Sequence, residues 1–237
     1  MILAVLPFVG ELLRWEVRYL NLVCGHAQAE VSQGPDQSLR IEGTAKNADW
    51  YSAIYTLNDR VLSHWRPGQG SQRYETWFAE GGFLEEQRWS FDPTGIDTWR
   101  RQWKQGAWQT SEGRRTGGPG LEDPVSAFFR LRIEPGPGPW SFPVFSGKTA
   151  WTLTVTPVGA VYPAQGPDGA VPAQDYTLTT AHRGDLEQKG RLVLTLSDDE
   201  ARLPLALVAH TNVGAIRARL VSRRRRYPAT KIRRRRF

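Results

Sequence analysis

Residues 191–220 consist of three short apolar runs separated by turn-forming residues. In the first run Leu192, Leu194 and Leu196 alternate with Val193 and Thr195, which is the two-residue period of a β-strand. An acidic segment, residues 197–200, then interrupts the run with side chains that favour turns. This pattern predicts that Asp198 and Asp199 join two antiparallel strands, with four leucines facing the core: Leu194, Leu196, Leu205 and Leu207.

The same alternation recurs along most of the chain, at intervals of roughly ten residues that all-β folds commonly show. The strongest examples are residues 11–31, 38–45, 50–58, 60–65, 74–80, 83–91, 149–158 and 176–181. The 23 glycines and 16 prolines supply frequent turns, and the abundant aromatic residues suit pleated surfaces. We therefore predict one all-β, mostly antiparallel domain over residues 11–222, built either as a single curved, barrel-like sheet or as a sandwich.

One short helix is predicted near residues 124–131. Asp123 is a residue type that caps helices, and Pro124 suits the first helical position. Phe128 and Leu131 are three residues apart, so they share one face of such a helix.

The formal net charge of +7 comes from the end of the chain. Nine basic residues lie within residues 223–237, so the remaining chain has a net charge of −2. We predict a disordered tail over residues 223–237 that could bind nucleic acid or an anionic membrane, or could serve only solubility. Its arginines are Arg223, Arg224, Arg225, Arg226, Arg233, Arg234, Arg235 and Arg236.

The first ten residues form an apolar lead without a basic start or a small-residue cleavage site. They are either a cytoplasmic N-terminus or the remnant of a signal peptide, and the segment is too short to span a bilayer. Cys24 is the single cysteine, which excludes an intramolecular disulfide and a cysteine-based zinc site. We interpret it as a small buried residue.

No residue pattern indicates catalysis. Asp198, Asp199 and Glu200 are adjacent in a turn, whereas carboxylates that work as an acid–base pair converge across a cleft. The histidines lack metal-ligand spacing, and no serine lies in a nucleophile-elbow sequence. We expect neither an enzyme, nor a metal, nor a cofactor. The four histidines are His26, His64, His182 and His210.

Aromatic residues concentrate between residues 77 and 108 and are interleaved with arginine and glutamine. Such a surface could stack sugars or line a lipid cleft, although the same residues could simply build the core. The candidate ligand-binding residues are Trp77, Trp89, Trp99, Trp103 and Trp108.

Several segments together resemble the bacterial family known as domain of unknown function 3108 (DUF3108). The opening strand pair carries that family's recurring residues at Gly10, Glu11, Trp15, Tyr19 and Gly25. Residues 123–132 are similar to the family's helix, and residues 144–159 to the strand that follows. The closing hairpin matches at Asp199, Arg202, Pro204 and Gly214.

The resemblance covers most of residues 7–220. It implies a mostly-β exported envelope protein of Gram-negative bacteria, with no established activity and no catalytic residues. We expect a non-catalytic periplasmic or cell-envelope protein that binds an apolar or glycan ligand in a β cleft; it would be cytoplasmic if Met1 is the true start. The alternatives are a scaffolding envelope protein without a small ligand and, third, a hydrolase.

Overall fold

A computed structural model of the chain describes residues 8–53, 55–134, 136–180, 192–211 and 214–225. Within these residues, fourteen antiparallel strands form one sheet that does not close on itself. The all-β prediction is therefore confirmed as a single curved sheet. Its strands are β1 (Glu11–Tyr19), β2 (Leu22–Gln33), β3 (Leu39–Asn47), β4 (Asn58–Arg66), β5 (Gly70–Glu80), β6 (Phe83–Asp92), β7 (Gly95–Lys104), β8 (Ala107–Arg115), β9 (Trp140–Phe145), β10 (Ala150–Gly166), β11 (Gly169–Thr180), β12 (Leu192–Ser197), β13 (Pro204–Thr211) and β14 (Gly214–Arg225).

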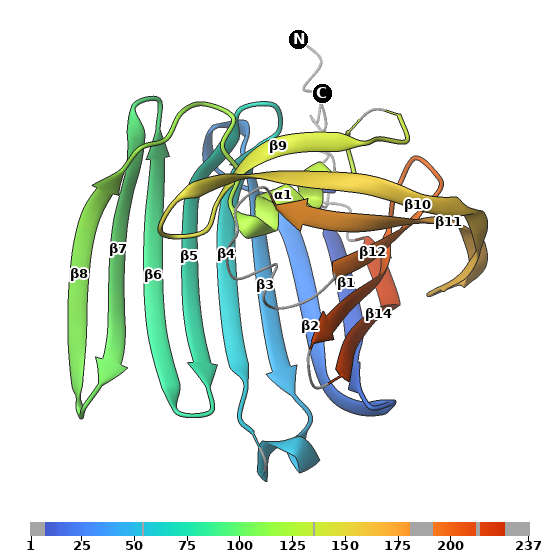
Figure 1. The fold of residues 1–237 in the computed structure, drawn as a ribbon, viewed down its shortest axis with the longest axis horizontal. Helices are drawn as coiled ribbons and strands as arrows, with labels where there is room; N and C mark the ends of the chain where they lie inside the picture. The colour runs from blue at the N-terminus through green and yellow to red at the C-terminus, as the bar shows by residue number, and fades with distance from the viewer. Residues whose placement is uncertain (1–7, 54, 135, 181–191, 212–213, 226–237) are drawn as a thin grey trace, which may run out of the picture.

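The sheet consists of two meanders joined where the first strand meets the last. The order runs from β8 back to β1, continues into β14, and then runs back to β9. Strands β1–β8 stand side by side, whereas β9–β11 cross over their upper part almost at right angles (Figure 1). The sheet thus curls over on itself and encloses one helix.

Helix α1 (Pro124–Arg130) begins at the residue that the sequence predicts as its cap. The Asp123 carboxylate accepts hydrogen bonds from the backbone N–H groups of Val125 and Ser126, and the Ser126 hydroxyl accepts one from the Asp123 N–H. This reciprocal pair is a capping box. Ser63 of β4 and Ser71 of β5 also donate to the carboxylate, so the helix is fixed to the face of the sheet that it covers, which we call the inner face.

The core lies between α1 and the inner face. From the first meander, Leu13, Val31 and Ile41 are buried against Phe129 of the helix. The second meander buries Leu194 and Leu196 against the side chains of β9–β11. Leu205 is buried in the cluster that contains Phe129, and the partly buried Leu207 packs against the cluster of Leu194 and Leu196. These leucines flank the 198–199 turn, so the predicted β12–β13 pair and its inward face are confirmed.

The two edge strands of the sheet, β8 and β9, do not pair with each other in the described residues. Side-chain packing between β9 and the first meander covers this side instead. An isolated bridge joins Glu122 to Val144 of β9, and the Phe145 ring packs edge-on against Trp89 at a centroid distance of 4.9 Å. The outermost strand, β8, is exposed along almost its whole length. The curved sheet therefore resembles a barrel that stops short of closure.

Two sequence-based boundaries are wrong. Residues 50–58 are predicted as a strand, but the chain forms a 3-10 helix there, η2 (Asp49–Ala53), and β4 begins only at Asn58. Strand β14 continues to Arg225, so Arg223, Arg224 and Arg225 belong to the sheet, where they pair with Leu13, Leu12 and Glu11. The run of basic residues by itself predicts disorder, because the pairing with β1 that orders these residues cannot be read from the local sequence. Arg226, Arg233, Arg234, Arg235 and Arg236 lie outside the described residues, as do residues 1–7 of the apolar lead.

Candidate ligand-binding site

The structure does not bring the five candidate tryptophans together. Trp89 pairs across strands with Tyr74, which in turn is opposite Ser63, and Ser63 bonds Asp123 of the helix cap. Trp89 therefore lies on the inner face, where it is only 5% exposed. The other four lie on the opposite, outer face of β5–β8: Trp77, Trp99, Trp103 and Trp108.

The four outer tryptophans form a ladder with arginines from neighbouring strands. The guanidinium groups of Arg60, Arg88 and Arg101 lie 4.7 Å, 4.5 Å and 4.7 Å from the ring centroids of Trp77, Trp99 and Trp108. Such cation–π contacts stabilise adjacent strands. Guanidinium groups thus cover one face of three of these rings, and only Trp103 and Trp108, at the end of the ladder, are among the exposed large hydrophobic residues.

A more suitable site lies on the inner face, below α1. A cavity of about 460 Å³ is lined there by apolar and aromatic residues of β1–β3, β14 and the β3–β4 connection. We call it the inner-face cavity. Its volume falls within the range of roughly 300–1,000 Å³ that is usual for small-molecule sites. Its lining residues are Val17, Tyr19, Cys24, Gly25, His26, Ala45, Lys46, Asn47, Tyr51, Tyr55, Leu57 and Ile216.

Small residues make room for this cavity. On the inner face, Gly25 and Ala27 of β2 lie opposite Asn47 and Ala45 of β3. A Cβ atom at Gly25 would come within 2.6 Å of the Lys46 carbonyl oxygen, so this position accepts only glycine. The sheet is therefore hollowed where longer side chains would otherwise fill the concave face.

The pairing register of β1 and β2 also changes at the cavity wall. A β-bulge between Val17 and Arg18 leaves Cys24 outside the regular pairing of β1 with β2. The Cys24 thiol is 3.4 Å from the Val17 carbonyl oxygen, and burial raises its pKa. Cys24 is thus half-buried at the cavity wall, whereas the sequence predicts a buried residue.

The connection that carries η2 forms one lip of the cavity. Asn47 holds it, donating from Nδ2 to the Tyr55 carbonyl oxygen at 2.7 Å and accepting from the Leu57 N–H at 2.9 Å. The Tyr55 hydroxyl donates to Glu80 at 3.2 Å. In the strand that follows, burial, reinforced by Glu80, raises the pKa of Asp59 to about 6.

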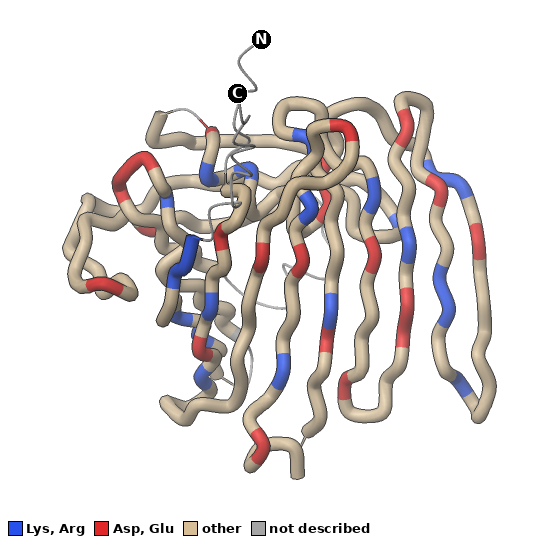
Figure 2. The backbone as a smooth tube through the Cα atoms, turned by 180° about the vertical axis from the view of Figure 1, so that it is seen from behind, with Lys and Arg blue, Asp and Glu red and all other residues tan. Residues whose placement is uncertain are grey.

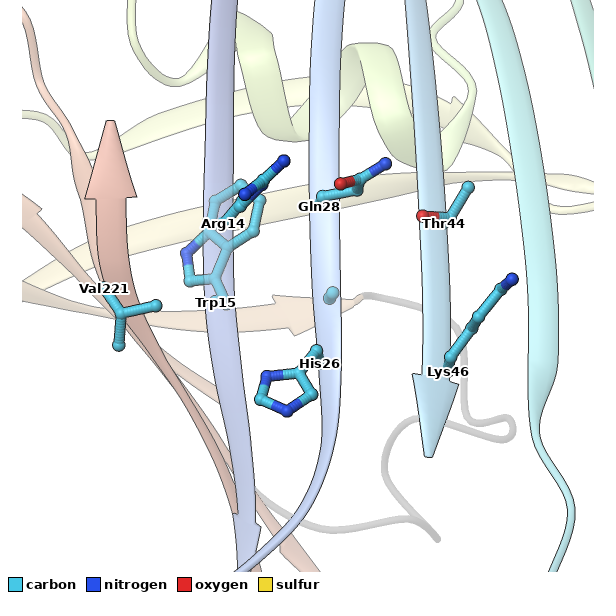
Figure 3. Close-up of a pocket in the computed structure, with 8 residues that line it drawn as sticks. Arg14, Trp15, His26, Gln28, Thr44, Lys46 and Val221 are labelled. Carbon is cyan, nitrogen blue, oxygen red and sulfur yellow. The ribbon is translucent and has the colours of Figure 1, made fainter. Parts of the chain in front are cut away.

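The outer face of β1–β3 has a second depression, of about 510 Å³. Arg14, His26, Gln28, Thr44 and Lys46 project towards it from three adjacent strands (Figure 3). Glu16, Glu30 and Glu42 lie on the same face of these strands. Their carboxylates offset the basic groups, so the depression does not form a concentrated anion site.

Two clusters of buried polar side chains connect elements of the fold to one another. Asp123 is fully buried, and its oxygens accept from Ser63, Ser71 and the helix backbone. Burial raises its pKa, and these hydrogen bonds oppose that shift. Among the residues that the structure describes, no three of His, Cys, Asp and Glu converge as a possible metal site.

The second cluster surrounds Glu11. Its carboxylate accepts from Arg132 Nη1 at 2.5 Å and from Arg223 Nε at 3.0 Å. Arg132 also donates to the Ala201 carbonyl oxygen at 3.1 Å. Arg223, predicted as part of a disordered tail, thus pairs with a buried carboxylate.

The family model for proteins of unknown function DUF3108 matches residues 14–221. The chain belongs to this family. None of the curated proteins compared with it matches this chain. A solved structure with a similar fold is the β-barrel-like protein of domain of unknown function DUF1849 from Brucella abortus.

The two folds superpose with a TM-score of 0.62 at 9% sequence identity, over 93% of this DUF3108 chain and 99% of the Brucella chain. At this identity the likeness concerns the fold alone. No helix in the described part of the DUF3108 chain combines the length and apolarity required to cross a membrane.

Proposed function

We propose that this DUF3108 protein is a non-catalytic binding protein of the bacterial cell envelope that holds an apolar ligand, such as an acyl chain, in the inner-face cavity. The observation that carries the proposal is the cavity itself, which is largely apolar and has a floor of small side chains. Apolar pockets with a few polar groups at the rim are typical ligand sites. The envelope location is supported by the sequence resemblance.

The chemistry of the lining favours an apolar ligand over a glycan. Val17, Ala45 and Ile216 present only hydrocarbon, and Asn47 and Tyr55 already use their polar groups in hydrogen bonds with neighbouring residues. A sugar would bury hydroxyl groups against this surface without enough partners. An acyl chain would exclude water from it instead.

The proposal is tested by filling the cavity. Ala45→Trp places an indole in the cavity, whereas Thr44→Trp places it on the outer face of the same strand and serves as the matched control. The probe is N-phenyl-1-naphthylamine, which fluoresces in apolar surroundings. We expect saturable binding by the wild type and Thr44→Trp, and binding at least about tenfold weaker by Ala45→Trp. Equal binding by all three proteins would contradict the proposal.

Cys24 provides a second readout that requires no substitution. A ligand in the cavity should slow the reaction of its thiol with a disulfide reagent, because Cys24 lines the cavity and is the single cysteine of the chain. Unchanged reactivity at saturating probe would place the probe elsewhere. Native mass spectrometry of the gently extracted protein identifies any ligand, and a bare chain would favour the scaffolding alternative.

A further inference from the structure

Four chain connections lie together at one end of the sheet, which we call the hairpin end. They are the β1–β2 turn, the η2 connection between β3 and β4, and the β5–β6 and β7–β8 turns. All four follow the lower edge of the sheet in Figure 1. They lie together because every second connection of an antiparallel meander returns to the same end.

Each of these connections exposes two large hydrophobic side chains. Their exposed fractions range from 36% to 69%, whereas side chains of these types are usually buried. The eight residues are Leu20 and Leu22, Trp50 and Tyr55, Phe83 and Leu84, and Trp103 and Trp108.

The opposite end of the same strands has a different character. Its connections contain Pro35–Gln37, residues 66–70 and residues 92–95. None of the large hydrophobic residues exposed in the described part of the chain lies in these three segments. Exposure of hydrophobic residues is therefore a property of one end rather than of turns in general.

The arrangement suits a lipid surface. The exposed side chains lie on four connections in a row along one end of the sheet, so an extended surface such as a bilayer can contact all four at once. Leucine, phenylalanine, tryptophan and tyrosine are the residues that insert into the interfacial region of a bilayer. Lys46 and Lys104 lie at this end together with Asp49 and Glu80, so its apolar side chains rather than a net charge distinguish it, and the other charged residues of β1–β8 are distributed along the strands (Figure 2).

The inner-face cavity reaches the same end. Tyr51, Tyr55 and Leu57, which line it, belong to the η2 connection, and Tyr19 precedes the β1–β2 turn. A bilayer at the hairpin end would therefore lie beside the lip of the cavity.

We propose that the hairpin end docks on a lipid bilayer and inserts these side chains into its interfacial region. The proposal adds a partner to the proposed ligand-binding role, and vesicle binding tests it without reference to the ligand.

The test is co-sedimentation of the full chain with vesicles of phosphatidylethanolamine and phosphatidylglycerol, at about 0.1 M and about 0.5 M NaCl. The tip variant carries Leu20→Ser, Phe83→Thr and Leu84→Thr. The matched control carries Ile133→Ser, Val158→Ser and Val161→Ser, which change equally exposed apolar residues elsewhere. All six side chains are exposed, so both variants should fold like the wild type.

We expect the wild type and the control to bind at both salt concentrations. The tip variant should bind at least about fivefold less. Equal binding by the tip variant, or absence of wild-type binding, would overturn the proposal. Wild-type binding that disappears at the higher salt concentration would assign the contact to the arginines and would also overturn it. Dimerisation that the tip variant abolishes, without vesicle binding, would identify a second copy as the occupant instead.

The experiments distinguish failure of the ligand-binding proposal from failure of the bilayer-docking proposal. The tip variant should still bind N-phenyl-1-naphthylamine, because it leaves every residue lining the cavity unchanged. Ala45→Trp should still bind vesicles, because it changes no residue that is exposed at the hairpin end.

Discussion

At the scale of single residues, Glu11 connects segments that are far apart in the sequence. Its buried carboxylate joins β1 to Arg132, just after α1, and to Arg223 near the end of β14. Arg132 in turn donates to the carbonyl oxygen of Ala201, in the β12–β13 turn. A buried ion pair is not necessarily more stabilising than apolar packing, but it is costly to break because the remaining charge stays buried.

Glu11→Ala should lower the free energy of unfolding by about 3–5 kcal/mol, because Arg132 would remain buried without its carboxylate. The control is Glu16→Ala on the outer face of the same strand, which removes a solvent-exposed pair with Arg18 and should cost less than about 1 kcal/mol. Urea denaturation of both variants measures the difference. Similar losses would show that the buried network is unimportant for stability.

Glu122 makes stability depend on pH. Burial raises its pKa to about 7, although the Arg130 guanidinium opposes the shift. The folded protein therefore holds this proton more tightly than the unfolded chain, whose pKa is that of an ordinary glutamate. Stability should fall as pH rises from about 4.5 to about 7, by roughly 3 kcal/mol, and this contribution should be constant above that range.

Glu122→Gln removes the titrating group and keeps its shape. The difference between the unfolding free energies of the variant and the wild type should increase with pH across that window. Urea denaturation at intervals from pH 4.5 to pH 8 measures it. A constant difference would show that Glu122 titrates at its usual pKa in the folded protein.

At the scale of elements, the sequence predicts those features that depend on contacts between residues close together in the chain, such as the start of α1 and the 198–199 turn. Asp123 and Pro124 mark the start of α1 because capping depends on neighbouring backbone groups. The 198–199 turn is equally local: the Asp199 carboxylate accepts from the Arg202 N–H at 3.0 Å. The alternation in β12 and β13 then shows which leucines face the core.

The faces of the tryptophans depend on register, which alternation within one strand does not reveal. Glu80 and Phe83 pair across the two-residue turn at Gly81 and Gly82. Counting outward from that turn pairs Trp77 with Glu86 and Trp89 with Tyr74, on opposite faces. The turn is thus a signal in the sequence that separates Trp89 from Trp77.

The inner-face cavity was missed because its signal is the absence of large side chains. Gly25, Ala27 and Ala29 occupy successive inner positions of β2, and Gly43 and Ala45 do so in β3. Small residues at alternate positions of neighbouring strands indicate a hollow surface, but only once the strands are known to be neighbours. The pairing of β1 with β14 is another feature that no local pattern predicts, since about two hundred residues separate the two strands.

At the scale of the whole molecule, the arginines that end β14 and the exposed hydrophobic residues of the hairpin end lie at opposite ends of the sheet. Strand β14 begins beside Tyr19 near the hairpin end and runs to Arg225, which pairs with Glu11 at the other end. The arginine-rich segment therefore starts at the end opposite the exposed hydrophobic residues. An electrostatic partner of the arginines and a bilayer at the hairpin end would contact different ends of the molecule.

Truncation after Arg225 and truncation after Ser222 should differ in their effect on folding. In the described residues, the pairing of β14 with β1 ends at Arg225, so the shorter deletion should leave the melting temperature unchanged. The longer deletion also removes three strand residues and the Arg223 contact with Glu11. A loss of about 2 kcal/mol would lower the melting temperature by roughly 4–8 °C.

Both truncations should abolish salt-sensitive retention on heparin, because electrostatic binding of this kind depends on the number of basic groups and weakens steeply with ionic strength. Both should still bind vesicles at about 0.5 M NaCl, since the hairpin end is unchanged. Scanning calorimetry and heparin chromatography of the three chains measure these effects. If truncation after Arg225 lowered the melting temperature as much as truncation after Ser222, residues beyond the strand would contribute to folding, and the boundary between sheet and basic segment would lie further along the chain.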